Sequence, residues 1–66
     1  MWELSVVYAN AERQGNTYHF DEKPQVSTKG TNVLVHSGTL EGREQEVWLY
    51  IDNVAAWWVL APRQRQ

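Results

Sequence analysis

Three side chains in the first half of the chain have the chemistry to bind a metal ion: His19, Asp21 and His36. Two imidazoles and one carboxylate form a ligand set that several transition metals accept. His19 and Asp21 are two residues apart, so on a strand they point to the same face. A shared site then requires His36 on a neighbouring strand. The alternative is two polar positions on solvent-facing strands followed by a turn aspartate, and the lack of a recognised ligand spacing favours this alternative.

The sequence shows no other arrangement typical of catalysis. Ser37 directly follows His36, and neighbouring residues of a strand point to opposite faces, so the hydroxyl and the imidazole stay out of hydrogen-bond reach. No glycine-rich loop precedes a helix, so no phosphate-binding loop is expected. The glutamates at 41, 44 and 46 surround a polar segment, where carboxylates usually serve solubility and edge protection. We therefore predict a protein that is not an enzyme and that uses no metal and no cofactor.

The length and composition limit how the chain can be stabilised. Its 66 residues suffice for one domain. A chain this short buries only about 60% of the surface that its unfolded form exposes, so small domains usually need additional stabilisation. The chain has no cysteine, which excludes disulfides and thiolate metal sites, and it has only two histidines. Oligomerisation or a firmly bound partner is the remaining source of stability.

The charge pattern and the apolar runs bear on partners and location. The net charge is −2, with six basic and eight acidic residues, which provides no basic face for nucleic acid. The longest apolar run, Val54–Leu60, has seven residues, far below the length that spans a membrane. The first residues lack the basic and apolar regions of a signal peptide. We therefore expect no membrane partner and a cytoplasmic location, which for a viral protein is the host cytoplasm.

The alternation of apolar and polar residues predicts five short strands. They are expected at 2–9, 17–20, 32–36, 46–51 and Val54–Leu60, and pairing also has a further candidate at 25–28. In the first strand, the even positions from Trp2 to Tyr8 should face the core. The segments 10–16 and 37–45 are polar and contain glycine, so we expect a loop and an exposed hairpin connection. Residues 1–61 then form a single β domain, and 62–66 form a polar tail.

Five short strands with short connections predict an all-β fold, either a small barrel or a strongly bent sheet. The order of a polar hairpin, an apolar strand, a one-turn corner at Asp52-Asn53 and a second apolar strand resembles the C-terminal half of SH3-like barrels over residues 38–60. The acidic, tyrosine-rich first loop of peptide-binding SH3 domains is absent, so the resemblance does not extend to binding of proline-rich motifs. The alternative fold is an open antiparallel sheet that dimerises face to face.

The aromatic residues exceed what one small core accommodates. Trp57 and Trp58 are neighbours in an expected strand, so their indoles should point to opposite faces. Burial of one indole of about 200 Å², at about 25 cal/mol/Å², contributes at most roughly 5 kcal/mol before the cost of association. The full set has eight members: Trp2, Tyr8, Tyr18, Phe20, Trp48, Tyr50, Trp57 and Trp58.

The number of apolar residues on each face predicts which rings point outward. Trp58 shares its face with Val54, Ala56 and Leu60, which is the more apolar set, so we expect Trp58 inside and Trp57 outside. On residues 46–51, the aliphatic positions should face the core, which leaves Trp48 and Tyr50 outside. We expect Trp48, Tyr50 and Trp57 to form one aromatic contact surface, with Trp2 as a further candidate, because tryptophan and tyrosine are enriched at binding hot spots.

These observations predict a small protein–protein interaction module. We expect it to bind another protein or to assemble as a homo-oligomer, and its type fits a phage or mobile-element accessory protein that binds and inhibits a host protein. The alternative is a small barrel that binds single-stranded nucleic acid, since exposed aromatic rings can stack on bases. That mode requires a positively charged track, whereas the basic residues of this chain are scattered.

Overall fold

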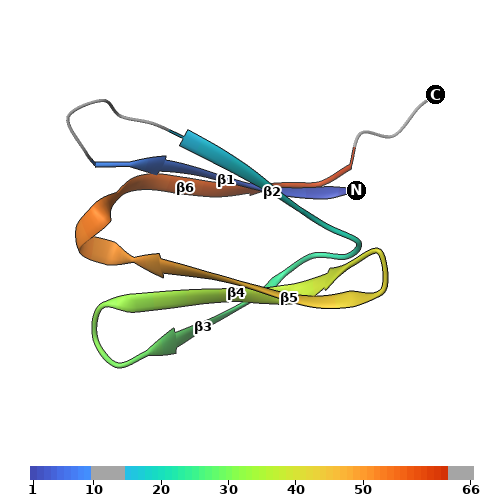
Figure 1. The fold of residues 1–66 in the computed structure, drawn as a ribbon. Coiled ribbons are helices and arrows are strands. Elements are labelled where there is room, and N and C mark those ends of the chain that lie inside the picture. The colour runs from blue at the N-terminus through green and yellow to red at the C-terminus, as the bar shows by residue number, and fades with distance from the viewer. Residues whose placement is uncertain (10–14, 63–66) are drawn as a thin grey trace.

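The computed structural model describes residues 1–9 and 15–62. These residues form six β-strands and one 3₁₀ turn, with no α-helix among them (Figure 1). No helix in this described part is long and apolar enough to cross a membrane. Most of the predicted loop at 10–16 and of the predicted tail at 62–66 lies outside the described residues. The elements are β1 (Trp2–Tyr8), β2 (Gly15–Phe20), β3 (Gln25–Lys29), β4 (Val33–Leu40), β5 (Arg43–Tyr50), η1 (Ile51–Asn53) and β6 (Val54–Leu60).

The strands form two antiparallel sheets that lie over each other as two layers (Figure 1). The strand order is β2-β1-β6 in the first sheet and β3-β4-β5 in the second. Among the described residues, no strand pairs with both sheets, so the molecule is an open sandwich. The all-β antiparallel prediction is confirmed, and the open-sheet alternative describes the structure better than a closed SH3-like barrel. The chain passes between the layers through η1, which leaves β5 and β6 in different sheets.

The core lies between the two layers and follows the alternation of side chains along each strand. β1 contributes Leu4 and Val6, which confirms that its even positions face inward. Phe20 comes from the end of β2, and Val47 and Leu49 come from β5. All five side chains are buried, and half-buried aromatic residues pack around them. A period of two therefore directs one face of each of these strands into a single small cluster.

One close contact fixes how the two layers meet. Phe20 packs against β4 at Gly38, where an added Cβ would lie 2.9 Å from Cδ1 of the phenyl ring. A side chain at position 38 would therefore displace the ring. A glycine inside a strand often marks such a close approach, and here it leaves room beside β4 for Phe20, the largest fully buried side chain.

The polar segment 37–45, predicted as an exposed hairpin connection, does form a hairpin, but most of its residues belong to the two strands rather than to the connection. β4 and β5 pair as far as Leu40 and Arg43, and only Glu41 and Gly42 form the turn. Both turn residues have positive φ, 54° and 80°, as in the type I′ turn of a two-residue hairpin. Asp21 stabilises this turn, because its Oδ1 and Oδ2 accept hydrogen bonds from the N–H groups of Glu41 and Gly42 at 3.0 and 3.1 Å.

The strand count of five was also too low. The segment 25–28 forms a complete edge strand, β3, which pairs with β4 from Gln25↔Ser37 to Lys29↔Val33. All five residues of β3 are exposed. The apolar pattern that identifies strands is weak here because Val26 is the only large apolar residue of this strand.

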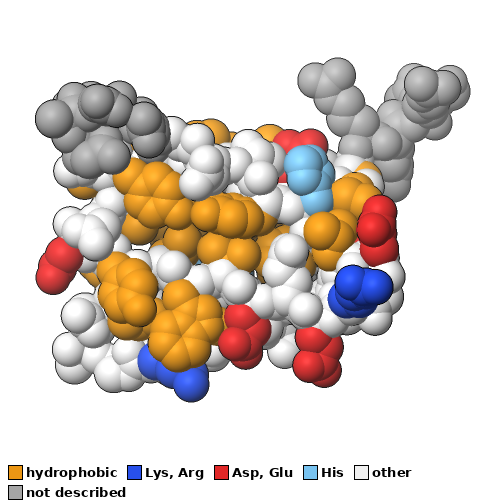
Figure 2. All heavy atoms as spheres, in the orientation of Figure 1, with side chains coloured by type: hydrophobic (Ala, Val, Ile, Leu, Met, Phe, Trp, Pro, Cys, Tyr) orange, Lys and Arg blue, Asp and Glu red, His pale blue; other side chains and the backbone are white. Residues whose placement is uncertain are grey.

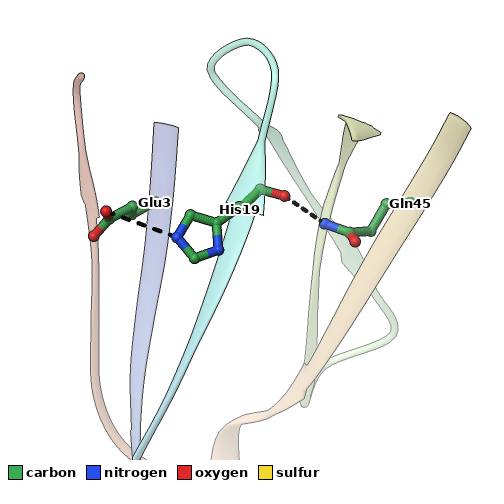
Figure 3. Close-up of polar contacts among 3 residues, drawn as sticks. All are labelled: Glu3, His19 and Gln45. Carbon is green, nitrogen blue, oxygen red and sulfur yellow. Dashed lines mark hydrogen bonds and ion pairs between the residues drawn. The ribbon is translucent and has the colours of Figure 1, made fainter. Parts of the chain in front are cut away.

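Two hydrogen bonds among the described residues join the layers where β2 ends beside the β4–β5 hairpin. The Asp21 N–H donates to the Thr39 carbonyl oxygen at 2.7 Å. Nε2 of Gln45 donates to the His19 carbonyl oxygen at 2.9 Å (Figure 3). Figure 3 also shows the His19 ring beside Glu3, with Nε2 3.8 Å from a carboxylate oxygen. The two hydrogen bonds join the end of β2 to the β4–β5 hairpin, whereas the His19–Glu3 contact lies within the first sheet. Within residues 1–9 and 15–62, no hydrogen bond joins β6 to β3.

Candidate interaction surfaces

Two aromatic side chains of β5 lie on the outer face of the second sheet. Trp48 and Tyr50 are two residues apart, so they share a face, and they are 42% and 50% exposed. The prediction that these rings point away from the core is confirmed. They stand opposite Val35 and Val33 of β4, which are nearly fully buried. The aromatic rings therefore also shield the outward-facing valines, which explains why β4 is apolar on both faces.

The Trp48 ring is held by charged neighbours. The Lys29 Nζ lies 4.8 Å from the ring centroid, which is a cation–π contact. The indole Nε1 donates a hydrogen bond to Oε1 of Glu46 at 3.3 Å. The indole is therefore oriented before any partner binds, which lowers the entropy lost on association. Figure 2 shows how the side chains are distributed on this face of the molecule. Hydrophobic side chains lie over both layers at one end, and charged side chains lie near the β4–β5 turn.

Trp57 does not join this outer surface, which corrects the sequence prediction. It lies opposite the buried Val6 in the β1–β6 pairing, and so it points between the layers. Its ring meets His36 edge-on, with the centroids 4.6 Å apart and the planes at 77°. Trp58 lies opposite Ser5 on the other face and is 43% exposed. The predicted inward and outward positions of the two indoles are therefore reversed.

A register irregularity in β6 explains the reversal. Val7 pairs with Ala56 and Tyr8 pairs with Val54, so Ala55 is an extra residue in β6. An extra residue of this kind interrupts the alternation of faces. Val54 therefore shares the inner face with Trp57 and Val59 rather than with Trp58. The apolar residues of Val54–Leu60 were assigned to faces by a strict period of two, and the irregularity makes that assignment wrong.

Trp2 lies on β1 against the core, away from the outer face of the second sheet that carries Trp48 and Tyr50. It is half-buried, lies opposite Phe20 and packs against the core cluster. Of the four predicted contact residues, the structure therefore places Trp48 and Tyr50 together. It places Trp57 in the other sheet and Trp2 against the core. Sequence reasoning missed Leu60, which is 50% exposed beside the outward-facing Trp58.

A narrow apolar groove runs beside β6 where it crosses the second sheet. Its volume is about 260 Å³. Trp57 is 38% exposed although it points inward, and Val26 on the inner side of β3 is 46% exposed. The sandwich is therefore less well covered on this side than where β2 meets the hairpin. The groove is lined by Leu34, Leu49, Ile51, Val54, Ala55, Ala56 and Trp57.

His36 lies behind this groove and is completely buried. Neither ring nitrogen has a hydrogen-bond partner among the described residues. Its cross-strand neighbours are Val26 and Val47, and Trp57 covers it from the other layer. No charged group faces the ring among these neighbours. Burial lowers the pKa of His36 below its usual value of 6.5, because this apolar environment disfavours the charged form.

The metal-ligand alternative loses its geometric basis. His19 lies on β2 and His36 on β4, in different sheets, and the Asp21 carboxylate is used by the hairpin turn. Among residues 1–9 and 15–62, no three His, Cys, Asp or Glu side chains are placed to hold a metal ion. The site residues therefore offer apolar and aromatic contacts.

A comparison of the chain with protein-family models, curated proteins and solved structures found no match.

Proposed function

We propose that this protein is a small, non-enzymatic protein–protein interaction module. The observation that supports the proposal is the exposure of its tryptophans. Trp48, Trp57 and Trp58 are 42%, 38% and 43% exposed, and all three lie on paired strands. Strands fix these rings in place, and exposed apolar surface of this kind marks contact sites in soluble proteins. The function is binding another protein or a second copy of the chain.

The exposed area of the tryptophan rings indicates how many of them a partner must cover to form a stable complex. Trp58, 43% exposed, leaves roughly 85 Å² of an indole of about 200 Å² in water, and its burial contributes about 2 kcal/mol. Three such rings contribute roughly 6 kcal/mol together, which is near the lower end of the entropic cost of association. A stable complex must therefore engage more than one ring and their apolar neighbours, Tyr50 and Leu60.

The biological setting is also a proposal. The chain has 66 residues and no cysteine, and its described residues include exposed tryptophans on paired strands. This combination fits an accessory protein of a phage or mobile element that binds and inhibits a host protein in the host cytoplasm. It also fits a protein that assembles as a homo-oligomer. In both cases the exposed tryptophans carry the contact.

Binding of single-stranded nucleic acid is the second candidate, favoured by one observation. Trp48 is an exposed ring beside a cation, Lys29, and such pairs can stack on a base and contact its phosphate. Glu46 touches the same indole, however, and the chain carries a net charge of −2. The electrostatics around the ring therefore support a protein partner better. Affinity that falls steeply with salt would identify the nucleic-acid function instead.

The test compares two arginine variants, Trp48→Arg and Trp58→Arg, with Lys23→Ala as the matched surface control. An arginine stem still covers the residues beneath it, whereas its charged group opposes an apolar partner. We expect at least one arginine variant to lose the association of the wild-type chain, measured by light scattering or by capture of a defined partner. Urea unfolding should show that the variant remains folded. If neither variant changes any association, the proposed function is wrong.

A further inference from the structure

The described edge strands of the two sheets differ in how they are protected. β2, β3, β5 and β6 each have one side free of sheet pairing. β5 begins with Arg43 and Glu44, β3 ends with Lys29, and β2 contains Gly15. Natural sheets use charges and irregular residues of this kind to prevent pairing with other chains. β6 alone has no charge, glycine or proline among its seven residues.

We propose that β6 pairs with β6 of a second copy, in antiparallel orientation, and joins two first sheets into one six-stranded sheet. This inference rests on the proposed function, because it names the partner of the same apolar strand. A free edge presents unpaired N–H and C=O groups, and a second strand satisfies them. The arrangement is an edge-to-edge dimer, which differs from the face-to-face dimer of the alternative fold considered in the sequence analysis.

The residue pattern of β6 fits its own copy. The irregularity at Ala55 leaves a regular segment of five residues, 56–60, whose central residue is Trp58. A two-fold axis at Trp58 pairs all five residues with those of the copy. It places the small Ala56 opposite the large Leu60, so the side chains along the new seam differ in size. A symmetric interface of this kind requires the same patch to be complementary to itself.

The pairing also covers the apolar surface on both sides of the strand. Residues directly opposite each other in an antiparallel pair point to the same face. In this register Trp57 lies next to Val59 of the copy on the inner face, beside the groove. Trp58 meets Trp58 of the copy on the outer face. Both tryptophans of β6, which are partly exposed in the single chain, therefore gain a neighbouring side chain from the copy through one symmetric contact.

The first test is the mass in solution. Light scattering on wild-type protein, across micromolar to millimolar concentrations, should show a species of twice the 7.7-kDa chain mass. Trp58→Lys places two like charges at the axis and should raise the dimer dissociation constant by at least about tenfold. Thr28→Lys, on the exposed edge strand β3, is the matched control and should leave the mass unchanged. Circular dichroism checks that each variant is folded, and Ala56→Lys serves as a second variant if Trp58→Lys does not fold.

The second test fixes the register. The chain has no native cysteine, so an introduced one reports contacts cleanly. Opposite residues of antiparallel strands have Cα atoms about 4.5–5.5 Å apart, which suits a disulfide. A mixture of Ala56→Cys and Leu60→Cys chains should form a mixed disulfide under mild oxidation. Ser5→Cys, on the same face but one strand further from the axis, should not cross-link.

The outcomes separate this inference from the proposed function. A wild-type chain that stays monomeric at millimolar concentration overturns the β6 dimer. If that monomer still captures a defined protein partner through Trp48, the proposed function stands. A dimer that survives both Trp58→Lys and Ala56→Lys but is lost in Trp48→Arg places the interface on the second sheet and also overturns the inference.

Discussion

The buried imidazole of His36 should make the stability of this domain depend on pH in a predictable direction. The ring is fully buried, and neither nitrogen has a hydrogen-bond partner among the described residues. Burial lowers its pKa in the folded protein, whereas the unfolded chain has a pKa near 6.5. Above pH 6.5 both states are neutral, and the histidine causes no pH dependence. Below pH 6.5 the unfolded state binds the proton first, so stability falls as the pH decreases.

The magnitude follows from proton linkage. Between pH 6.5 and the lower folded-state pKa, one histidine reduces the free energy of unfolding by up to about 1.4 kcal/mol per pH unit. A domain of this length has a total stability of roughly 3–10 kcal/mol. One pH unit in this window therefore removes a substantial part of the stability. The loss levels off below the folded-state pKa, where both states carry the proton.

The assay is urea unfolding followed by tryptophan fluorescence between pH 7.5 and pH 5.5, at one protein concentration. His36→Leu should abolish the slope in this range, because it removes the titrating group. It should also raise the stability at pH 7.5 by about 1–3 kcal/mol, because two unpaired polar atoms leave the core. His19→Gln removes the other histidine, which is exposed, and should retain the slope. If His36→Leu and the wild-type chain lose stability in parallel, the buried-histidine reasoning is refuted.

Three further perturbations test the packing that positions the surfaces. Gly38→Ala should lower the free energy of unfolding, measured by urea melts, by about 1–3 kcal/mol, because the alanine Cβ would lie 2.9 Å from the Phe20 ring. Adding Phe20→Leu to the same chain should recover part of this loss. Asp21→Asn should lower the melting temperature at pH 7, because the turn loses its carboxylate acceptor. These hydrogen bonds hold the pKa of the Asp21 carboxyl below its usual value of 3.8, so the stability that they provide is present above pH 3.8 and is lost as the pH falls through the lowered pKa of the folded state. A variant with the same melting temperature as wild type from pH 7 to pH 3 would contradict this. Lys29→Met should reduce stability by about 0.5–1 kcal/mol through loss of the contact with Trp48, and Lys23→Met, on a residue with no such contact among the described ones, should have little effect.

The regular strands could be predicted because their residues alternate cleanly. Val54–Leu60 has the bounds expected from its apolar run, and the even positions of β1 face the core as expected. The hairpin at 37–45 was predicted, but its strands were expected to end earlier because this segment is polar and contains two glycines. The observed pairing, which continues from Ser37↔Glu46 to Leu40↔Arg43, shows that both strands reach the turn. Turn residues with positive φ are usually Gly or Asn, and Glu41 gives no such signal.

The candidate surface was harder to predict than the fold. Trp48 and Tyr50 were placed correctly because β5 keeps its alternation over its whole length. Trp57 was misplaced because a single extra residue, Ala55, changes which face each later side chain occupies. A strand irregularity depends on pairing with a partner strand, and the sequence of one strand does not reveal it. The groove beside β6 depends on how the two sheets pack against each other, and the alternation of residues within one strand does not predict that packing.

The pairing of β1 with β6 has a consequence for how the chain folds during synthesis. The second sheet consists of consecutive strands joined by short turns, so residues 25–50 can begin to pair as soon as they leave the ribosome. The first sheet needs Glu3 beside Leu60, which are at opposite ends of the chain. Contacts this distant in sequence form late, because a long loop must close first. Until then one edge of β1 is unpaired and the core lacks Val54 and Val59, which pack against it. The nascent protein should therefore be most vulnerable to proteases and most in need of chaperones just before β6 emerges.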